Sequence, residues 1–163
     1  MRGASRAGLK PRFGVDNDPI PLATLKKNFP DVDVYEMCVN EFVSLPDPDG
    51  NCKCDILHIS PVCCFFSGIN TGINKRRLQG QGQKDEANEV TLFSVEHLLR
   101  KSKPRIVTVE QTFGLMLPKH RWHFNQLLRQ FVDNEFSVRW ERVMFAGLGL
   151  PSERKRLIMM GAW

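Results

Sequence analysis

Apolar residues recur along the chain with two spacings, one typical of strands and one typical of helices. Short apolar or β-branched runs predict strands at Arg12–Val15, Val32–Tyr35, Ile56–Ile59, Ile106–Val109, Val138–Phe145 and Leu157–Met160. Helical spacing predicts helices from Pro19 to about Asn28, along Leu92, Val95, Leu98 and Leu99, and along Phe124, Leu127, Leu128 and Phe131. Strands that alternate with helices predict an α/β fold on a parallel sheet with right-handed crossovers.

Two polar segments interrupt this pattern and predict loops. Asp47–Asn51 has the composition of a turn. Gly68–Asn88 is rich in glycine, glutamine and charge, and a loop of that length in a compact domain is usually functional or disordered. The 163 residues suffice for one domain with a hydrophobic core. No apolar run reaches the roughly 20 residues that span a membrane, and no secretory signal is visible, so we expect a soluble, intracellular protein.

Charge and cysteine content exclude only a few classes of protein. The net charge of +5 suits a polyanionic partner but is also typical of a solvated surface. Five cysteines without a secretory signal argue against a disulfide framework. Zinc is disfavoured because Cys52 and Cys54, and Cys63 and Cys64, lack the usual ligand spacing. The ordinary reading of each cysteine is a small buried apolar residue.

Chemically useful side chains follow the predicted strands, where parallel α/β sheets bind their ligands. Asp16 follows the first strand, Cys63 the third and Glu110 the fourth. We therefore expect the three side chains to face one crevice. There, Asp16 could accept hydrogen bonds from ribose hydroxyls, the Cys63 thiol could act as a nucleophile, and a partly desolvated Glu110 could donate a proton.

Each of these residues also has an ordinary structural explanation. Asp16 could cap a helix or close a turn. Cys63 could be an unreactive thiol buried among aromatic residues. Glu110 could be a capping residue or an ion-pair partner of Arg105 or Lys119. Taken one at a time, the ordinary explanations of Asp16, Cys63 and Glu110 are favoured.

Basic clusters occur at Arg154–Arg156 and at Lys75–Arg77. Two arginines could clamp a phosphate or the edge of a base. Basic triplets are nevertheless usually solvated surface, so neither cluster identifies a nucleic-acid site alone.

Taken together and in order, these segments resemble the C5-cytosine DNA methyltransferases. Pro61–Ser67 is similar to the family's nucleophile loop, a Pro-Pro-Cys-Gln followed by Phe-Ser, and Cys54–Ser60 is similar to the Asp-Leu-Leu strand before it. Glu110–Thr112 corresponds to Glu-Asn-Val, and Gly149–Arg156 to Gly-x-Pro with Gln-x-Arg-x-Arg. Two further segments match the family's cofactor side, at Asp16–Pro30 and Ala7–Leu9. The resemblance covers nearly the whole chain.

Departures from the family pattern are also visible. Glu-Gln-Thr in place of Glu-Asn-Val resembles the fungal subgroup linked to repeat-induced point mutation and premeiotic methylation. Val62 and Cys64 replace a proline and a glutamine of the nucleophile loop, and Ser152 replaces a glutamine. Either Cys38 or Asn40 stands where the family has an adenine-contacting aspartate.

The resemblance implies a Rossmann-like methyltransferase sheet that is mostly parallel, with helices on both faces, and incomplete at its N-terminus. Residues 1–163 then correspond to part of a catalytic domain. The Phe-x-Gly-x-Gly cofactor loop, the target-recognition domain and the closing C-terminal helix of the family have no counterpart in this sequence.

The implied activity is methyl transfer from S-adenosyl-L-methionine to carbon 5 of cytosine in DNA. The cytosine swings out of the helix, Cys63 attacks its carbon 6, and Glu110 hydrogen-bonds or protonates ring nitrogen 3. Arg154 and Arg156 hold the flipped nucleotide. Lys75, Arg76 and Arg77 belong to a loop that closes over DNA.

The resemblance also implies sites for cofactor and DNA without a metal. The expected cofactor contacts are Asp16, Asn17, Cys38 and Pro61. The expected DNA contacts are Ser67, Lys75, Arg76 and Arg77. A nuclear location follows from the fungal resemblance. The alternative is a non-catalytic relative of this fold that binds DNA or protein.

Overall fold

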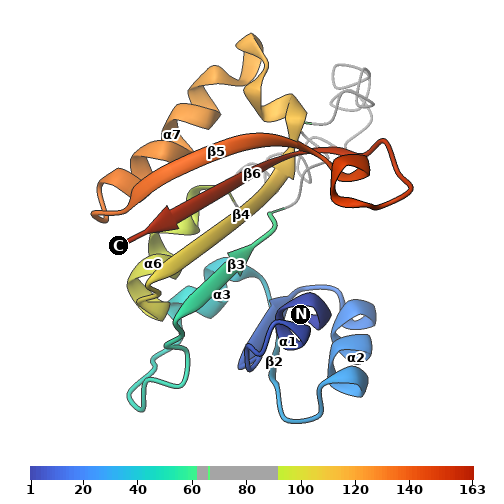
Figure 1. Cartoon of the computed structure of the whole chain (residues 1–163). Helices are drawn as coiled ribbons and strands as arrows, with labels where there is room; N and C mark the ends of the chain where they lie inside the picture. The colour runs from blue at the N-terminus through green and yellow to red at the C-terminus, as the bar shows by residue number, and fades with distance from the viewer. Residues whose placement is uncertain (62–65, 67–91) are drawn as a thin grey trace, which may run out of the picture. The chain divides into compact units, whose positions relative to one another are not determined.

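The computed structural model describes residues 1–61, 66 and 92–163 (Figure 1). The described part forms two compact units, Met1–Cys54 and Asp55–Trp163. The loop predicted at Gly68–Asn88 lies outside the described residues. Within the described ranges, none of the helices combines the length and the apolar character needed to span a membrane.

The first unit is a two-stranded parallel sheet with a helix against each face. Its elements are α1 (Arg2–Arg6), β1 (Phe13–Asp16), α2 (Pro19–Asn28), β2 (Asp33–Glu36) and α3 (Val39–Ser44). Phe42 of α3 stacks on Phe13 of β1 with ring centroids 5.6 Å apart. Gly14, the next residue of β1, points to the opposite face and lies against Leu25 of α2. The two-residue period of β1 therefore places α2 and α3 on opposite sides.

The start of α2 follows directly from its sequence. The carboxylate of Asp18 accepts the Ile20 N–H at 2.9 Å, which satisfies one of the unpaired donors of the first turn. Pro19 occupies the first helical position, where its missing N–H has no intrahelical role. The helix predicted from Pro19 to about Asn28 is confirmed.

The second unit is built on a four-stranded sheet. Its elements are β3 (Ile56–Ile59), α6 (Val95–Ser102), β4 (Ile106–Thr112), η2 (Phe113–Met116), η3 (Pro118–His120), α7 (Arg121–Val132), β5 (Ser137–Met144), η4 (Phe145–Leu148) and β6 (Lys155–Ala162). The strand order is β3-β4-β6-β5. β3 pairs with β4 in parallel, whereas β6 pairs antiparallel with both β4 and β5. Three of these strands thus share one direction.

The predicted α/β class with a mostly parallel sheet is confirmed, and β6 is the exception. The sequence did not indicate which strand would depart from the parallel arrangement. β5 turns back into β6 through η4 and a short connection, without a helix that would return the chain to its starting edge. The two strands therefore form a hairpin-like pair.

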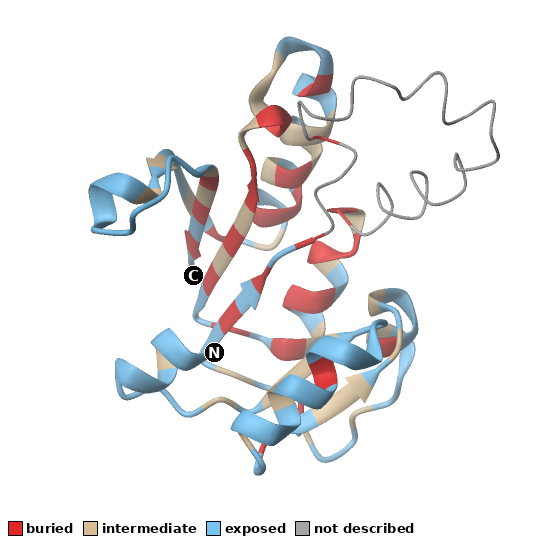
Figure 2. Ribbon diagram, turned by 90° about the vertical axis from the view of Figure 1, so that its right-hand side faces the viewer, coloured by how far each residue is buried: buried red, intermediate tan, exposed pale blue. Residues whose placement is uncertain are grey.

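The hydrophobic core of the second unit lies on one face of this sheet (Figure 2). Val107 and Val109 of β4 and Leu157 and Met159 of β6 are fully buried, and Val109 pairs directly with Met159. The predicted helical stripes supply the other side of the core, with Leu92, Val95, Leu98, Leu99, Leu127 and Phe131 buried. Burial of these apolar side chains is the main stabilising contribution of the unit.

Two strands are longer than predicted: β6 runs from Lys155 to Ala162 rather than from Leu157 to Met160, and β4 is also extended. The sequence placed the end of the fourth strand at Val109, but β4 continues to Thr112. Glu110, Gln111 and Thr112 pair with Ile158, Leu157 and Arg156 of β6. Pairing with a neighbouring strand thus extends β4 through Glu110, whose own preference for strands is weak.

Gly161 of β6 marks the closest approach of α7 to the sheet. A Cβ atom at this position would lie 2.8 Å from Cδ1 and 2.9 Å from Cε1 of Phe131. We expect Gly161→Ala to lower the free energy of unfolding by about 1–3 kcal/mol, because the ring must move within a packed core. Urea denaturation measures this change.

Gly147→Ala in η4 is the matched control, since a Cβ atom there meets nothing within 4 Å. Its free energy of unfolding should stay within about 0.5 kcal/mol of the wild type. Equal losses in the two variants would contradict the proposed packing of α7.

Candidate active site

A carboxylate at the carboxyl ends of β3 and β4 forms the centre of the candidate site. Val109 and Gln111 of β4 are buried on the face covered by α7, so Glu110 between them points to the opposite face. In the parallel register, Ile59 of β3 lies beside Val109. Ser60, the next residue, therefore lies beside Glu110.

Both oxygens of the Glu110 carboxylate accept hydrogen bonds. Arg156 Nε lies 2.6 Å from Oε1, and Arg154 Nη2 lies 3.4 Å from the same atom. Ser60 Oγ donates to Oε2 at 2.9 Å. The side chains of Glu110 and Arg156 are only 18% and 19% exposed, whereas Arg154 is 51% exposed. Arg156 is thus the main partner of a partly buried ion pair.

This arrangement corrects one expectation and adds one residue. Glu110 does form ion pairs, but with Arg154 and Arg156 rather than with the expected Arg105 or Lys119. Sequence reasoning gave Ser60 no role. Its position before Pro61, at the end of the strand beside β4, was the available signal.

Gln111 ties the start of the predicted nucleophile segment to β4. Its side chain is fully buried. Its Nε2 donates to the Pro61 carbonyl oxygen at 3.2 Å, and its Oε1 accepts the Thr112 N–H at 2.7 Å. A buried amide is stable only when its polar atoms are paired, and these two contacts meet that requirement.

A second contact holds the other side of the same segment. Phe66 is 1% exposed, and its ring lies edge-on to His120 and His123 with centroid distances of 5.1 and 5.3 Å. Its carbonyl group approaches Gly114 so closely that a Cβ atom there would overlap it. Pro61 and Phe66 are thus both anchored to the structure around β4.

The remaining parts of the predicted nucleophile loop lie outside the described residues. These are Val62, Cys63 and Cys64, together with the predicted DNA contacts Ser67, Lys75, Arg76 and Arg77. Their roles remain predictions.

His58 of β3 shares the face of Glu110 and was not foreseen. Its Nδ1 lies 2.8 Å from Thr108 Oγ1 of β4. Burial lowers the pKa of the His58 imidazole, and the nearby Glu110 carboxylate opposes that shift. A neutral imidazole is consistent with its contact to a hydroxyl group.

The predicted cofactor contacts Asp16, Asn17 and Cys38 belong to the first unit. Asp16 Oδ1 accepts the Asp18 N–H at 3.0 Å, and Asp18 rather than Asp16 caps α2. Cys38 is the N-cap residue of α3, two residues after the end of β2, while Asn40 lies inside that helix. The Glu41 carboxylate accepts the Cys38 N–H at 3.0 Å, and this bond lowers the pKa of Glu41.

No group of three or more metal-binding side chains was found within residues 1–61, 66 and 92–163. The arrangement around Glu110 is instead suited to hydrogen bonding and charge stabilisation.

Solved structures similar to this chain are methyltransferases. One is a protein described as a DNA modification methyltransferase encoded within a prophage (E. coli), with a TM-score of 0.73 and 20% identity over 98% of this chain and 42% of the other. Another is the Dnmt2 methyltransferase of S. pombe, with a TM-score of 0.65 and 14% identity over 98% and 44%. The chain therefore has a Rossmann-like methyltransferase fold.

The sequence comparison is more specific. A family model described as C-5 cytosine-specific DNA methylase matches residues 2–162, and the chain belongs to this family. The type II methyltransferase M.XorII of Xanthomonas oryzae pv. oryzae is 28% identical over 172 aligned residues. The match covers 98% of this chain but only 37% of that relative, so the chain spans little more than a third of the relative's length.

The unequal exposure of the two arginines predicts unequal effects on stability. We expect Arg156→Ala to lower the free energy of unfolding by about 1–2 kcal/mol, because Glu110 would lose its short partner in a partly buried place. Arg154→Ala should cost less than about 0.5 kcal/mol, since that pair is long and exposed. Urea denaturation of both variants measures the two losses of stability. A larger loss for Arg154→Ala would show that Arg156 is not the main partner.

Proposed function

We propose that this chain acts in methyl transfer from S-adenosyl-L-methionine to carbon 5 of cytosine in DNA, with Cys63 as the nucleophile. The observation that carries the proposal is the Glu110 carboxylate, fixed by Arg156 and Ser60 at the end of β4. Gln111, the next residue, holds Pro61, which precedes Cys63 by two positions. One short stretch of β4 thus supports the expected base-recognition group and the segment with the expected nucleophile.

Two positions of the first unit fit the adenosine part of S-adenosylmethionine. Asp16 ends β1, and the bond to Asp18 uses only Oδ1, so Oδ2 can accept a ribose hydroxyl. Cys38 follows β2 at the start of α3 and is exposed. Its thiol offers a weaker contact than the family's aspartate. When bound, the cofactor supplies an electrophilic methyl group.

The chain's residues would divide the chemistry on cytosine as follows. The Cys63 thiolate forms a bond to carbon 6, and the displaced electron pair increases the nucleophilicity of carbon 5. The Glu110 carboxyl group, once protonated, donates a hydrogen bond to ring nitrogen 3 and stabilises the charge that develops there. After carbon 5 is methylated, a base removes its proton, and the bond between sulfur and carbon 6 breaks to restore the thiolate.

The ion pairs of Glu110 suggest how DNA binding would free its carboxyl group to contact the base. Arg154 and Arg156 both contact Oε1, which the base would also need. A nucleotide phosphate competes for the same guanidinium groups. Phosphate binding would therefore release Oε1 toward the base, while Ser60 continues to hold Oε2. The net charge of +5 also favours a polyanionic substrate.

The nucleophile can be tested directly. We expect Cys63→Ala to reduce transfer of tritiated methyl groups to DNA by at least about a thousandfold, since no other group would form the bond to carbon 6. Cys64→Ala is the matched neighbour and should keep most of the activity. Loss in Cys64→Ala alone would move the nucleophile to Cys64. A wild-type chain that binds DNA without methylating it would overturn the catalytic proposal and favour a non-catalytic role.

A substitution at Glu110 distinguishes a role in the chemical step from a role in DNA binding. Glu110→Gln keeps the shape but cannot deliver a proton, so we expect the single-turnover rate to fall by about 10²–10⁴-fold. The dissociation constant for DNA should change by less than about threefold, because the arginines remain. Rates come from methyl transfer and binding from fluorescence anisotropy. Equal losses in rate and binding would exclude this role.

A further inference from the structure

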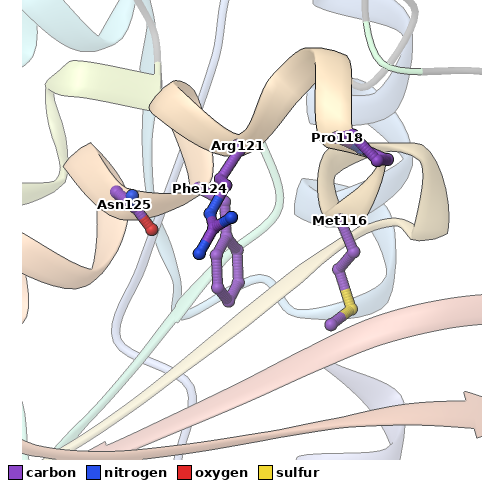
Figure 3. Close-up of a pocket in the computed structure, with 5 residues that line it drawn as sticks. All are labelled: Met116, Pro118, Arg121, Phe124 and Asn125. Carbon is purple, nitrogen blue, oxygen red and sulfur yellow. The ribbon is translucent and has the colours of Figure 1, made fainter.

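A pocket lies beside the N-terminal half of α7, on the opposite face of the sheet from Glu110 (Figure 3). Its volume is about 320 Å³, within the range of small-molecule sites. It is lined by Met116 of η2, Pro118 of η3, and Arg121, Phe124 and Asn125 of α7. Figure 3 shows Arg121 and Phe124 extending to the same side of α7, with Met116 across from them.

This pocket is separate from the candidate active site. Phe131 of α7 lies against Gly161 of β6, and Gly161 shares its face with the buried Val107 of β4. Glu110 pairs with Ile158, whose side chain points to the other face. A ligand beside α7 therefore cannot be the base that Glu110 would contact.

Further aromatic rings and a second arginine lie near the residues that line the pocket. Phe124, in its wall, meets Trp140 of β5 edge-on at a centroid distance of 5.5 Å. Arg142, two residues further along β5, lies over the ring of Phe113 at 5.2 Å. Phe113 starts the same η2 turn that supplies Met116. Such interleaving of flat rings and cations is typical of surfaces that bind single-stranded nucleic acid.

The charge of this region is not balanced by nearby carboxylates. Arg129, further along α7, pairs with Asp133. Arg121 and Arg142 form no ion pair within the part of the chain that the structure describes. None of the described lining residues is acidic. The pocket therefore favours an anionic ligand.

We propose that this pocket binds one nucleotide of single-stranded DNA. The base lies between the Phe124 ring and the Met116 thioether. The guanidinium of Arg121 binds the adjoining phosphate. An acidic peptide would contact Arg121 but would leave the slot between Phe124 and Met116 unused.

The test uses the whole chain and a labelled oligo(dA) of about 12 nucleotides, which contains no cytosine for the candidate active site. We expect Arg121→Ala to weaken binding about fivefold to tenfold in fluorescence anisotropy at fixed salt. Arg129→Ala removes the same charge from the same helix and should change binding less than about twofold. Phe124→Leu keeps an apolar side chain but removes the ring, and should also weaken binding.

Several results would overturn the proposal. Equal weakening by Arg121→Ala and Arg129→Ala would indicate a general effect of charge. Heparin binding that depends on Phe124 as strongly as oligo(dA) binding would exclude a base in the slot. A wild-type chain that does not bind oligo(dA) would exclude the site outright. The readout is binding of an oligonucleotide that contains no cytosine, so this result is independent of the proposed methyl transfer.

Discussion

The antiparallel pairing of β6 between β4 and β5 is the constraint on which the second unit depends. Side chains alternate along a strand, so this pairing gives β6 two separate roles. Leu157 and Met159 enter the core under α7, while Arg156 reaches Glu110 on the other face. Packing and charge placement are thus fixed by a single hydrogen-bonded ladder. The Glu110–Arg156 pair is therefore positioned by the core itself and not by a mobile surface contact.

The sequence predicted the positions of the strands and the buried helical stripes because apolar spacing reports directly on which side of an element is buried. It could not predict the direction of β6, since an apolar strand pattern is the same in either direction. It also could not predict that Gln111 is fully buried. That residue is polar, and the Pro61 carbonyl that satisfies it lies 50 positions earlier in the chain.

The candidate site could be predicted only in part from the sequence. The family resemblance singled out Glu110, Arg154 and Arg156, and the structure brings them into contact although 44 and 46 positions separate the arginines from the glutamate. Local composition alone favoured a solvated basic triplet. Ser60 was missed because a serine before a proline is unremarkable in sequence, and its value appears only when β3 and β4 are paired. The predicted cofactor contacts Asp16, Asn17 and Cys38 lie in the other unit, so their relation to Glu110 rests on the family alone.

The alternation in β6 also determines where the chain can change length. One residue inserted after Arg156 would shift every later residue to the opposite face, so that Ile158 and Met160 would replace Leu157 and Met159 in the core. One residue inserted between Leu148 and Pro151 leaves this register unchanged, because that stretch precedes the ladder. Evolution of this family should therefore accept insertions and deletions in the connection after β5 and reject them within β6.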